Sequence, residues 1–446
     1  MGNLKNLLSN LRNKQFSSDS KQAIKNSGYQ LSASLIMKLG SLIFTIVLAR
    51  ILLPEKMGLY YLALSTILLF SSFSDLGIST ALLTFVSKSL GKGNPEKAKA
   101  YFEKLLRWKV YLLLACSAVL LALSFFIAEY YYKKPIFYAL LIGGLYIPIT
   151  GFLTFLEQSF KASNNFRGPL LKEFIFQLLR ITIVPLGIFL LLNTGMQTSF
   201  IIAGVILSLT FCYLISLLVF VFITKKRLSF LKTSSDKLTS EENIGLKKFI
   251  IPLTATSLSG VFFGYMDTFL LGRFVPSEYI GYYSTAFALV ASVSVIISFI
   301  STSVFPILSK LEGESLEKFF KKTRKITLFF SVSSGILTYL LASLIVQIAY
   351  GSAYATSIPI LKYFAVLALI MPLSGLYDSY FISQRKTKVI AWLLISSTIL
   401  NLFLNLIGIT YGLKFSEFYA VVGAAIATVL SKAIYLVVLM IIKKKI

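Results

Sequence analysis

The sequence predicts an all-α polytopic membrane protein, built from twelve transmembrane helices in two pseudo-symmetric lobes of six. Composition, long apolar segments and an internal repeat support this fold class. The chain has 446 residues, of which 56% are hydrophobic and 14% charged, and its mean hydropathy is +0.79. Soluble domains carry about 25% charged residues. An ordinary soluble enzyme is therefore excluded, and lipid is the expected surroundings of most of the chain.

Twelve apolar segments follow one another along the chain. Each is long enough to cross a hydrocarbon core of about 30 Å as a helix, and none alternates like a barrel strand. The segments span residues 30–53, 58–86, 110–128, 136–160, 169–192, 199–223, 249–272, 280–308, 326–349, 357–383, 389–411 and 419–442.

Lys and Arg residues are distributed unevenly between the connections. If the N-terminus is cytoplasmic, 34 of the 44 lie in inner segments, six in outer loops and four within helices. This asymmetry is the positive-inside pattern, and it places both termini in the cytoplasm. The net charge of +26 is therefore a topology signal that favours contact with membrane lipids rather than nucleic acid.

Two polar segments lie outside the apolar ones. In the N-terminal segment, the leucines at positions 4, 7, 8 and 11 share one helical face, which predicts an amphipathic helix on the cytoplasmic membrane surface. The other segment, at 225–248, is the longest polar connection and falls at the centre of the chain. The predicted organisation is an N-terminal segment at 1–28, an N-lobe at 29–224, an inter-lobe loop at 225–248 and a C-lobe at 249–446.

The two halves share a motif at a shift of 223 residues. LARILLPEKMGLY at 48–60 aligns with LGRFVPSEYIGYY at 271–283, so Arg50 matches Arg273 and Gly58 matches Gly281. Two lobes of six helices have the same topology and are related by an axis along the membrane normal. Such lobes enclose a central cavity whose access alternates as one lobe rocks, and Arg50 and Arg273 are expected at its outer gate.

The residue types present exclude several chemistries. The chain has no His, which excludes a Ser-His-Asp triad and a His-ligated metal. Cys116 and Cys212 each lie in an apolar segment without a CxxC companion, so we expect two buried hydrophobes and no metal site. GKGNPEKAK at 91–99 lacks the G-x-x-x-x-G-K-[ST] pattern of a P-loop, which excludes an ATP-driven pump.

We single out eight ionisable residues within the predicted helices. A charge at mid-bilayer costs about 2.5–3.5 kcal/mol on insertion scales, so each needs a partner or a water-filled cavity. Lys38 and Asp75 fall at similar depth on consecutive helices, and a structural ion pair is favoured there over a proton-coupling site. Asp267 and Lys362, both toward the outer side, form a second candidate pair.

Two further acids, Glu157 and Asp378, lie near the inner rim. Lys161 follows Glu157 by four residues and is its expected partner across one helical turn. Arg385 lies seven residues beyond Asp378 and is a weaker candidate. These four residues are predicted to form an inner rim or gate.

Arg180 and Lys432 are the remaining charges, one in each half and both near the midplane. No acid shares their depth, so either backbone carbonyls and snorkelling satisfy them, or they face the central cavity and hold an anion such as phosphate. The Arg fork suits phosphate oxygens, and the Lys adds a point charge. Gln177, one turn before Arg180, lines the same face.

Several motifs give the chain a recognisable signature. They are RILLPEKMGLY at 50–60, SDLGIST at 74–80, FKASNNFRGP at 160–169 and MDTFLLGRFVPSEYIGYYS at 266–284. With them, the chain resembles the Wzx-type polysaccharide and O-antigen flippases, the polysaccharide-biosynthesis branch of the MATE-like exporter superfamily. The similarity covers essentially residues 25–442.

The resemblance implies a MATE-like fold and a function. Such a flippase moves an undecaprenyl-pyrophosphate-linked oligosaccharide from the inner to the outer leaflet of the bacterial plasma membrane. It is a transporter and not an enzyme, and it has no cofactor beyond a coupling proton or sodium ion, for which Asp75 and Asp267 are the candidate acids. Its expected partners are the lipid-linked oligosaccharide, membrane lipids and glycan polymerase or assembly proteins.

Two other functions remain as alternatives. A cation-drug antiporter of the same fold should place carboxylates in its cavity, whereas the unpaired midplane charges here are basic. A membrane glycan polymerase or ligase needs an external catalytic region, but the outer connections are only a few residues long.

Overall fold

The computed structural model describes residues 18–445, apart from the side chains at 18–21, 23–24, 255–256, 302, 306 and 445. The described chain is helical and contains no strand. The predicted amphipathic helix near the N-terminus lies outside the described residues. The helices are α2 (Ser18–Ser72), α3 (Ile78–Gly91), α4 (Pro95–Phe125), the π-helix η1 (Phe126–Tyr132), α5 (Phe137–Ala162), α6 (Arg167–Leu192), α7 (Thr198–Arg227), η2 (Ser229–Lys232), α8 (Ser240–Phe274), α9 (Ser277–Leu308), α10 (Gly313–Leu340), α11 (Ala342–Ala349), η3 (Ser352–Tyr354), α12 (Ser357–Ser383), α13 (Thr387–Gly412) and α14 (Glu417–Lys445).

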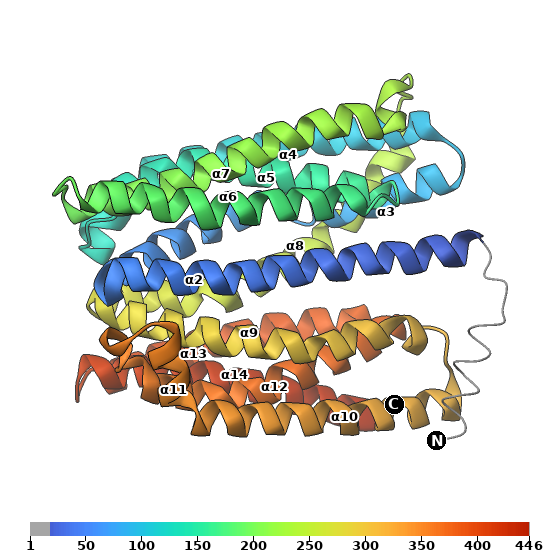
Figure 1. The fold of residues 1–446 in the computed structure, drawn as a ribbon. Coiled ribbons are helices and arrows are strands. Elements are labelled where there is room, and N and C mark those ends of the chain that lie inside the picture. Colours follow the sequence, from blue (N-terminus) through green and yellow to red (C-terminus); the bar gives the residue numbers. More distant parts are fainter. Residues whose placement is uncertain (1–17, 446) are drawn as a thin grey trace.

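The helices form two bundles that lie side by side (Figure 1). Helices α3 to α7 gather on one side and α9 to α14 on the other, with α2 running between them and packing on both α6 and α9. The start of α2 and the end of α14 lie at the same end of the molecule (Figure 1). We call the two bundles the N-lobe and the C-lobe.

Ten of the described helical stretches are long and apolar enough to cross a membrane, or eleven if the bent pair α10 and α11 forms one span. One of them, Lys25–Ser72, has 48 residues and contains a break at Leu53, where φ is 62° and ψ is 170°. Pro54 causes this break, because proline disfavours the helical conformation at the residue before it. The predicted helix 30–53 and the first part of the predicted helix 58–86 are therefore two arms of α2 that meet at a corner.

Two other predicted segments are also interrupted. The chain leaves the helix between Ser72 and Ile78, and Gly77 there has a φ of 84°, a left-handed conformation that glycine adopts without strain. The predicted segment 326–349 bends by 72° between α10 and α11. Apolar composition alone does not reveal these breaks, because the residues on both sides are equally hydrophobic.

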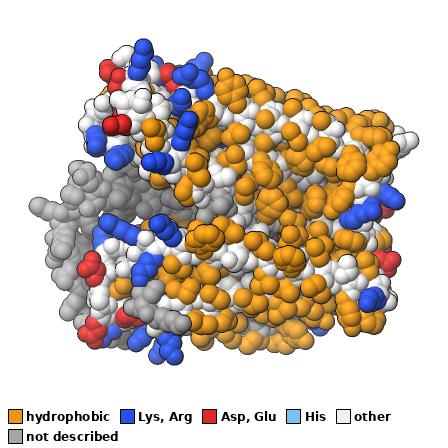
Figure 2. Space-filling model, turned by 180° about the vertical axis from the view of Figure 1, so that it is seen from behind, with side chains coloured by type: hydrophobic (Ala, Val, Ile, Leu, Met, Phe, Trp, Pro, Cys, Tyr) orange, Lys and Arg blue, Asp and Glu red, His pale blue; other side chains and the backbone are white. Residues whose placement is uncertain are grey.

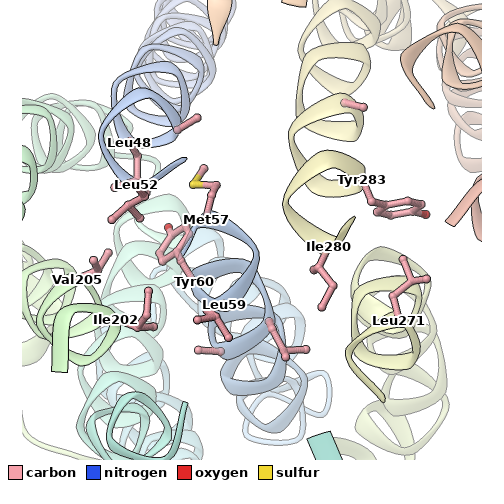
Figure 3. Packing of buried hydrophobic residues seen from close by; sticks show 14 of the residues in the cluster. Leu48, Leu52, Met57, Leu59, Tyr60, Ile202, Val205, Leu271, Ile280 and Tyr283 are labelled. Carbon is pink, nitrogen blue, oxygen red and sulfur yellow. The ribbon is translucent and has the colours of Figure 1, made fainter. Parts of the chain in front are cut away.

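A single buried cluster joins the two lobes near the corner of α2. Figure 3 shows Leu52, Met57 and Tyr60 of α2 in this cluster, with Ile280 of the C-lobe on the facing helix α9. The helices approach closely at Gly58, where an added Cβ would lie 1.7 Å from the backbone oxygen of Ser277.

Charged residues collect at one end of the molecule. Figure 2 shows Lys and Arg side chains gathered mainly at that end, whereas hydrophobic side chains cover the flanks between the two ends. The start of α2, the inter-lobe loop and the end of α14 lie at the charged end. We refer to it as the inner end and to the opposite end as the outer end, in accord with the charge asymmetry of the connections.

Candidate functional site

A polar cavity of about 520 Å³ lies within the N-lobe. Helices α2 to α7 surround it, and its wall carries both charged and hydroxyl side chains. Apolar segments of a membrane protein rarely enclose ionisable groups unless these groups serve a substrate or an ion. The charged residues of the wall are Asp75, Lys109, Glu157, Lys172, Glu173 and Arg180.

Arg180 is held rigidly at this cavity. Its Nη2 donates to the Ser41 hydroxyl at 3.0 Å and to Gln177 Oε1 at 2.7 Å. The guanidinium carbon lies 4.5 Å from the ring centre of Phe44 and 5.2 Å from that of Phe176. These contacts fix the plane of the fork, while Nε is buried without a hydrogen-bond partner among the described residues. Arg180 therefore retains donor capacity for a ligand.

From Arg180, a chain of polar contacts runs toward the inner end. Gln177 donates to Glu173 at 2.6 Å, and Lys172 bridges Glu173 and Glu157, both at 2.9 Å. Glu157 then pairs with Lys161 at 2.8 Å, which confirms the predicted i,i+4 contact. We call this set, residues 157, 161, 172, 173, 177 and 180, the polar ladder.

The backbone of α2 accommodates the polar ladder. A Cβ at Gly40 would lie 2.5 Å from Gln177 Oε1, so a larger residue there would displace this amide from its position against α2. The Gln177 amide also donates to the Met37 carbonyl at 3.4 Å. The amide thus links α6 to α2 while it positions Arg180.

Asp75 lies on the opposite part of the wall, but its partner is not the predicted one. The Lys109 ammonium lies 3.0 Å from Asp75 Oδ1, and the Ser79 hydroxyl donates to the same oxygen at 2.5 Å. Lys38 is exposed and forms no ion pair with Asp75. The predicted Lys38–Asp75 pair is wrong because α4 extends inward to Pro95, which brings Lys109 to the depth of Asp75.

In the C-lobe, Asp267 is the centre of a buried polar cluster. Tyr283 donates to it at 2.6 Å, Asn405 donates at 2.7 Å, and the Thr428 hydroxyl also contacts its carboxylate. Asn401 and Asn405 are fully buried, and neither Oδ1 has a hydrogen-bond partner among the described residues. The cluster thus contains one carboxylate and two free amide oxygens.

The predicted pairing of Asp267 with Lys362 is also wrong. Lys362 is exposed on an apolar surface groove, and its ammonium lies 5.4 Å from the ring centre of Tyr339. Both residues were expected toward the outer side, but they face in different directions. Depth along a helix does not determine the face that a residue occupies.

Lys432 does not line the N-lobe cavity with Arg180. Its ammonium lies 3.6 Å from the ring centre of Phe263 and forms no hydrogen bond to a described residue. Asp378, expected near the inner rim, accepts a hydrogen bond from Tyr435 at 2.5 Å. Arg385 is exposed and does not pair with Asp378.

At the outer end, the two repeat arginines make reciprocal contacts between the lobes. Arg50 of α2 donates to the carbonyls of Ile348 and Ala349 at the end of α11, the second at 2.8 Å. Arg273 of α8 donates to the Tyr131 carbonyl of η1 at 2.7 Å. Each lobe thus supplies an arginine to the carbonyl end of a short helix in the other lobe.

Glycines complete the closure at the outer end. The matched residues Gly58 and Gly281 face each other, and a Cβ at Gly281 would lie 2.1 Å from the Pro54 carbonyl oxygen. Lys134 adds a further contact between the lobes, because its ammonium donates to the Gly272 carbonyl at 2.6 Å. The structure is closed at its outer end.

Sequence reasoning missed three charged residues of the cavity. Lys109, Lys172 and Glu173 were not singled out as candidate site residues. One signal was available: Glu173, Gln177 and Arg180 follow one another at spacings of four and three residues, which places them on one face of a helix.

Comparisons with known proteins identify the family of the chain. The model of the family described as "Polysaccharide biosynthesis protein" matches residues 23–312. A curated relative, the "Probable low-salt glycan biosynthesis flippase Agl15" of Haloferax volcanii, is 25% identical over 185 residues, which is 40% of this chain and 37% of that protein.

Solved structures of transporters share the fold. An inward-facing multidrug resistance MATE transporter of the MOP superfamily has a TM-score of 0.70 at 13% identity, covering 91% of this chain and 94% of its own. Lipid II flippase MurJ in an inward closed conformation has a TM-score of 0.68 at 16% identity, covering 92% and 86%. With the family model matching more than half of its residues, the chain is a multi-pass membrane protein that belongs to the polysaccharide biosynthesis protein family.

Proposed function

We propose that this protein is a flippase that moves a polyprenyl-diphosphate-linked oligosaccharide from the inner to the outer leaflet of the plasma membrane. The observation that carries the proposal is the polar cavity of the N-lobe, whose wall holds an arginine with free donor capacity, in a structure whose two lobes are in contact at the outer end. Membership of the polysaccharide biosynthesis family supports the same reading.

Arg180 is the proposed anchor for the diphosphate. The other charged groups of the wall are engaged with one another, since Lys109 pairs with Asp75, and Lys172 pairs with Glu157 and Glu173. Among the described residues, Arg180 has only neutral hydrogen-bond partners, so its charge is available to an anion. A guanidinium fork is well suited to phosphate oxygens.

Alternating access follows from the two lobes. A substrate enters the cavity from the inner end while the arginine contacts and the Gly58–Gly281 contact keep the outer end closed. Release into the outer leaflet requires these contacts to separate as one lobe rocks against the other. In this scheme α2 contributes two crossings, divided at Leu53, which brings the total to twelve with both termini cytoplasmic.

The test is the distribution of lipid-linked oligosaccharide between leaflets after deletion of the gene. We expect inner-leaflet accumulation and loss of surface glycan, rescued by the wild type and not by Arg180→Ala. Arg180→Lys should rescue poorly despite its charge, because lysine lacks the fork. Lys92→Gln, at an exposed lysine outside the cavity, serves as the control for expression and insertion. Unchanged glycan with new sensitivity to cationic dyes would instead support a drug antiporter.

We propose further that Asp267 is the site at which a proton or sodium ion couples to transport. Its support is the buried cluster in which a carboxylate lies beside two amide oxygens that have no hydrogen-bond partner among the described residues. Oxygen ligands of this kind suit a hard cation. Lys432 then contributes to the charge balance of the C-lobe, since it interacts electrostatically with both Asp378 and Asp267.

Ligand-dependent melting separates the two ions. A bound ion stabilises the folded protein, so the melting temperature of the purified protein should rise with NaCl relative to KCl if sodium is the coupling ion. Asp267→Asn should abolish the difference, whereas Asp75→Asn should retain it. If the wild type melts at the same temperature in NaCl and KCl, a proton-driven uptake assay on the same two variants tests whether Asp267 couples transport to a proton.

A further inference from the structure

A second cavity, of about 210 Å³, lies between the lobes and borders the first. Leu68 of α2 lines both cavities, so the two spaces are neighbours. The second cavity is enclosed by α2 of the N-lobe and by α8 and α9 of the C-lobe. Its lining includes Tyr61 and Ser284, each three residues after a glycine of the outer closure, Gly58 and Gly281. The cavity therefore lies directly beneath that closure.

The lining of this cavity combines aromatic rings with hydroxyl groups. Tyr61, Tyr265 and Phe287 supply rings, while Ser284 and Thr268 supply hydroxyls. Ser284 is only 7% exposed, and its Oγ has no hydrogen-bond partner among the described residues. A buried hydroxyl that remains unpaired costs free energy, which a ligand hydroxyl would recover.

We propose that this cavity binds a single sugar ring, the one attached directly to the diphosphate. The proposal rests on the proposed function, because it assumes that Arg180 in the neighbouring cavity holds the diphosphate. Aromatic faces pack against the C–H face of a sugar, and Ser284 and the Tyr265 phenol remain to bond its hydroxyls. The Tyr265 phenol makes no side-chain hydrogen bond to a described residue.

Size and charge restrict the occupant. Pockets for drug-sized ligands have about 300–1,000 Å³, so this smaller cavity suits one ring and not an oligosaccharide. The wall carries one charged residue, Asp267, which would repel a phosphate and thus leaves the diphosphate at Arg180.

This arrangement gives the first sugar a role in transport. The ring would contact α2 from one lobe and both α8 and α9 from the other, beneath the closure that must open for release. A sugar that fits would thus bind to both lobes at once, whereas the bare diphosphate would contact the N-lobe alone. The identity of this sugar then contributes to the choice of substrate.

Binding of defined lipids to the purified full-length protein in nanodiscs tests the proposal. The probes are undecaprenyl diphosphate and the same lipid with one glucose, galactose or N-acetylglucosamine. We expect at least one of the three glycosylated probes to bind more tightly than the bare diphosphate. Ser284→Ala and Tyr265→Phe should each weaken that probe by about threefold to tenfold, the loss of one hydrogen bond, and leave the bare diphosphate unchanged.

Two further variants make the outcomes distinguishable. Ser292→Ala is the matched control, because the Ser292 hydroxyl bonds the Ala288 carbonyl of its own helix at 2.8 Å and does not line the cavity. Arg180→Ala should weaken every probe. Melting curves show that each variant is folded.

The possible results separate the sugar site from the diphosphate site. If Ser284→Ala and Tyr265→Phe leave the glycosylated probes unchanged or weaken all probes equally, or if no sugar improves binding, the sugar site is refuted. If Arg180→Ala has no effect on any probe, the proposed diphosphate site fails, and the sugar site stands only where binding of a glycosylated probe depends on Ser284.

Discussion

Closure of the outer end depends on direct backbone contact at Gly58, and an alanine there should open it. The alanine Cβ would lie 1.7 Å from the Ser277 carbonyl oxygen, whereas an ordinary contact begins at 3.4 Å. The α2 and α9 backbones would have to separate by about 1.7 Å, and no side chain can relieve the clash because the contact atom is backbone. Overpacking of this kind costs about 1–3 kcal/mol.

This clash destabilises the state in which the outer end is closed, whereas it is absent from a state in which the lobes are apart at that end. A differential of about 1–3 kcal/mol shifts a conformational equilibrium by about fivefold to 150-fold. Gly58→Ala should therefore increase the population that is open to the outside by such a factor. Transport should slow, because the return to the inward-facing state becomes less favourable.

Cysteine labelling measures this population. Ser65 lines the cavity beneath the closure and is 3% exposed, so a Ser65→Cys variant without the two native cysteines reports access from outside. An impermeant maleimide should label it faster when Gly58→Ala is present. Gly245→Ala is the control, since a Cβ there has no neighbour within 4 Å. Equal labelling rates in the two backgrounds would refute the role of the glycine contact.

Three further predictions concern charged groups. Replacing both Arg50 and Arg273 by Gln should raise the maleimide labelling rate of Ser65→Cys more than either change alone, because each arginine connects a different lobe to the other at the outer end. A double variant that is labelled no faster than the single variants would contradict this. Lys172→Met should destabilise the protein by about 3–5 kcal/mol in chemical unfolding, because it leaves the buried Glu173 carboxylate without a counter-charge while Glu157 keeps only Lys161. Lys318→Met at an exposed pair should have little effect, and similar losses would argue against the polar ladder. Burial, and to a lesser extent the nearby Arg273, lower the pKa of Lys134 to about 8, so the folded state loses this proton at a lower pH than the unfolded state does. The melting temperature of the wild type should therefore rise from pH 7 to pH 9 relative to that of Lys134→Met. A constant difference between the two proteins would exclude this linkage.

Some site features followed from local spacing. The Glu157–Lys161 pair and the adjacency of Gln177 and Arg180 were predictable because residues three and four apart on a helix are neighbours. The matching positions of Arg50 and Arg273 likewise came from a repeat visible in the sequence. These predictions needed only the period of the helix and the order of the segments.

Pairings between helices were not predictable in the same way. Asp75 was assigned to Lys38 and Asp267 to Lys362 from depth alone, but the structure pairs Asp75 with Lys109 and surrounds Asp267 with Tyr283, Asn405 and Thr428. Depth gives one coordinate of a side chain. The rotation of each helix about its axis gives the other, and packing against neighbours sets it.

The sequence by itself determined the membrane class, the two-lobe repeat, the charge asymmetry between the ends and the presence of unpaired basic residues in apolar segments. These properties depend on composition and linear spacing, which lipid and the helical period translate directly into structure. Only the tertiary structure decided where helices break, which charges meet, and that Arg180 and Lys432 lie at different sites. Those features depend on contacts between residues far apart in the chain, and many arrangements of equally apolar helices satisfy the same linear pattern.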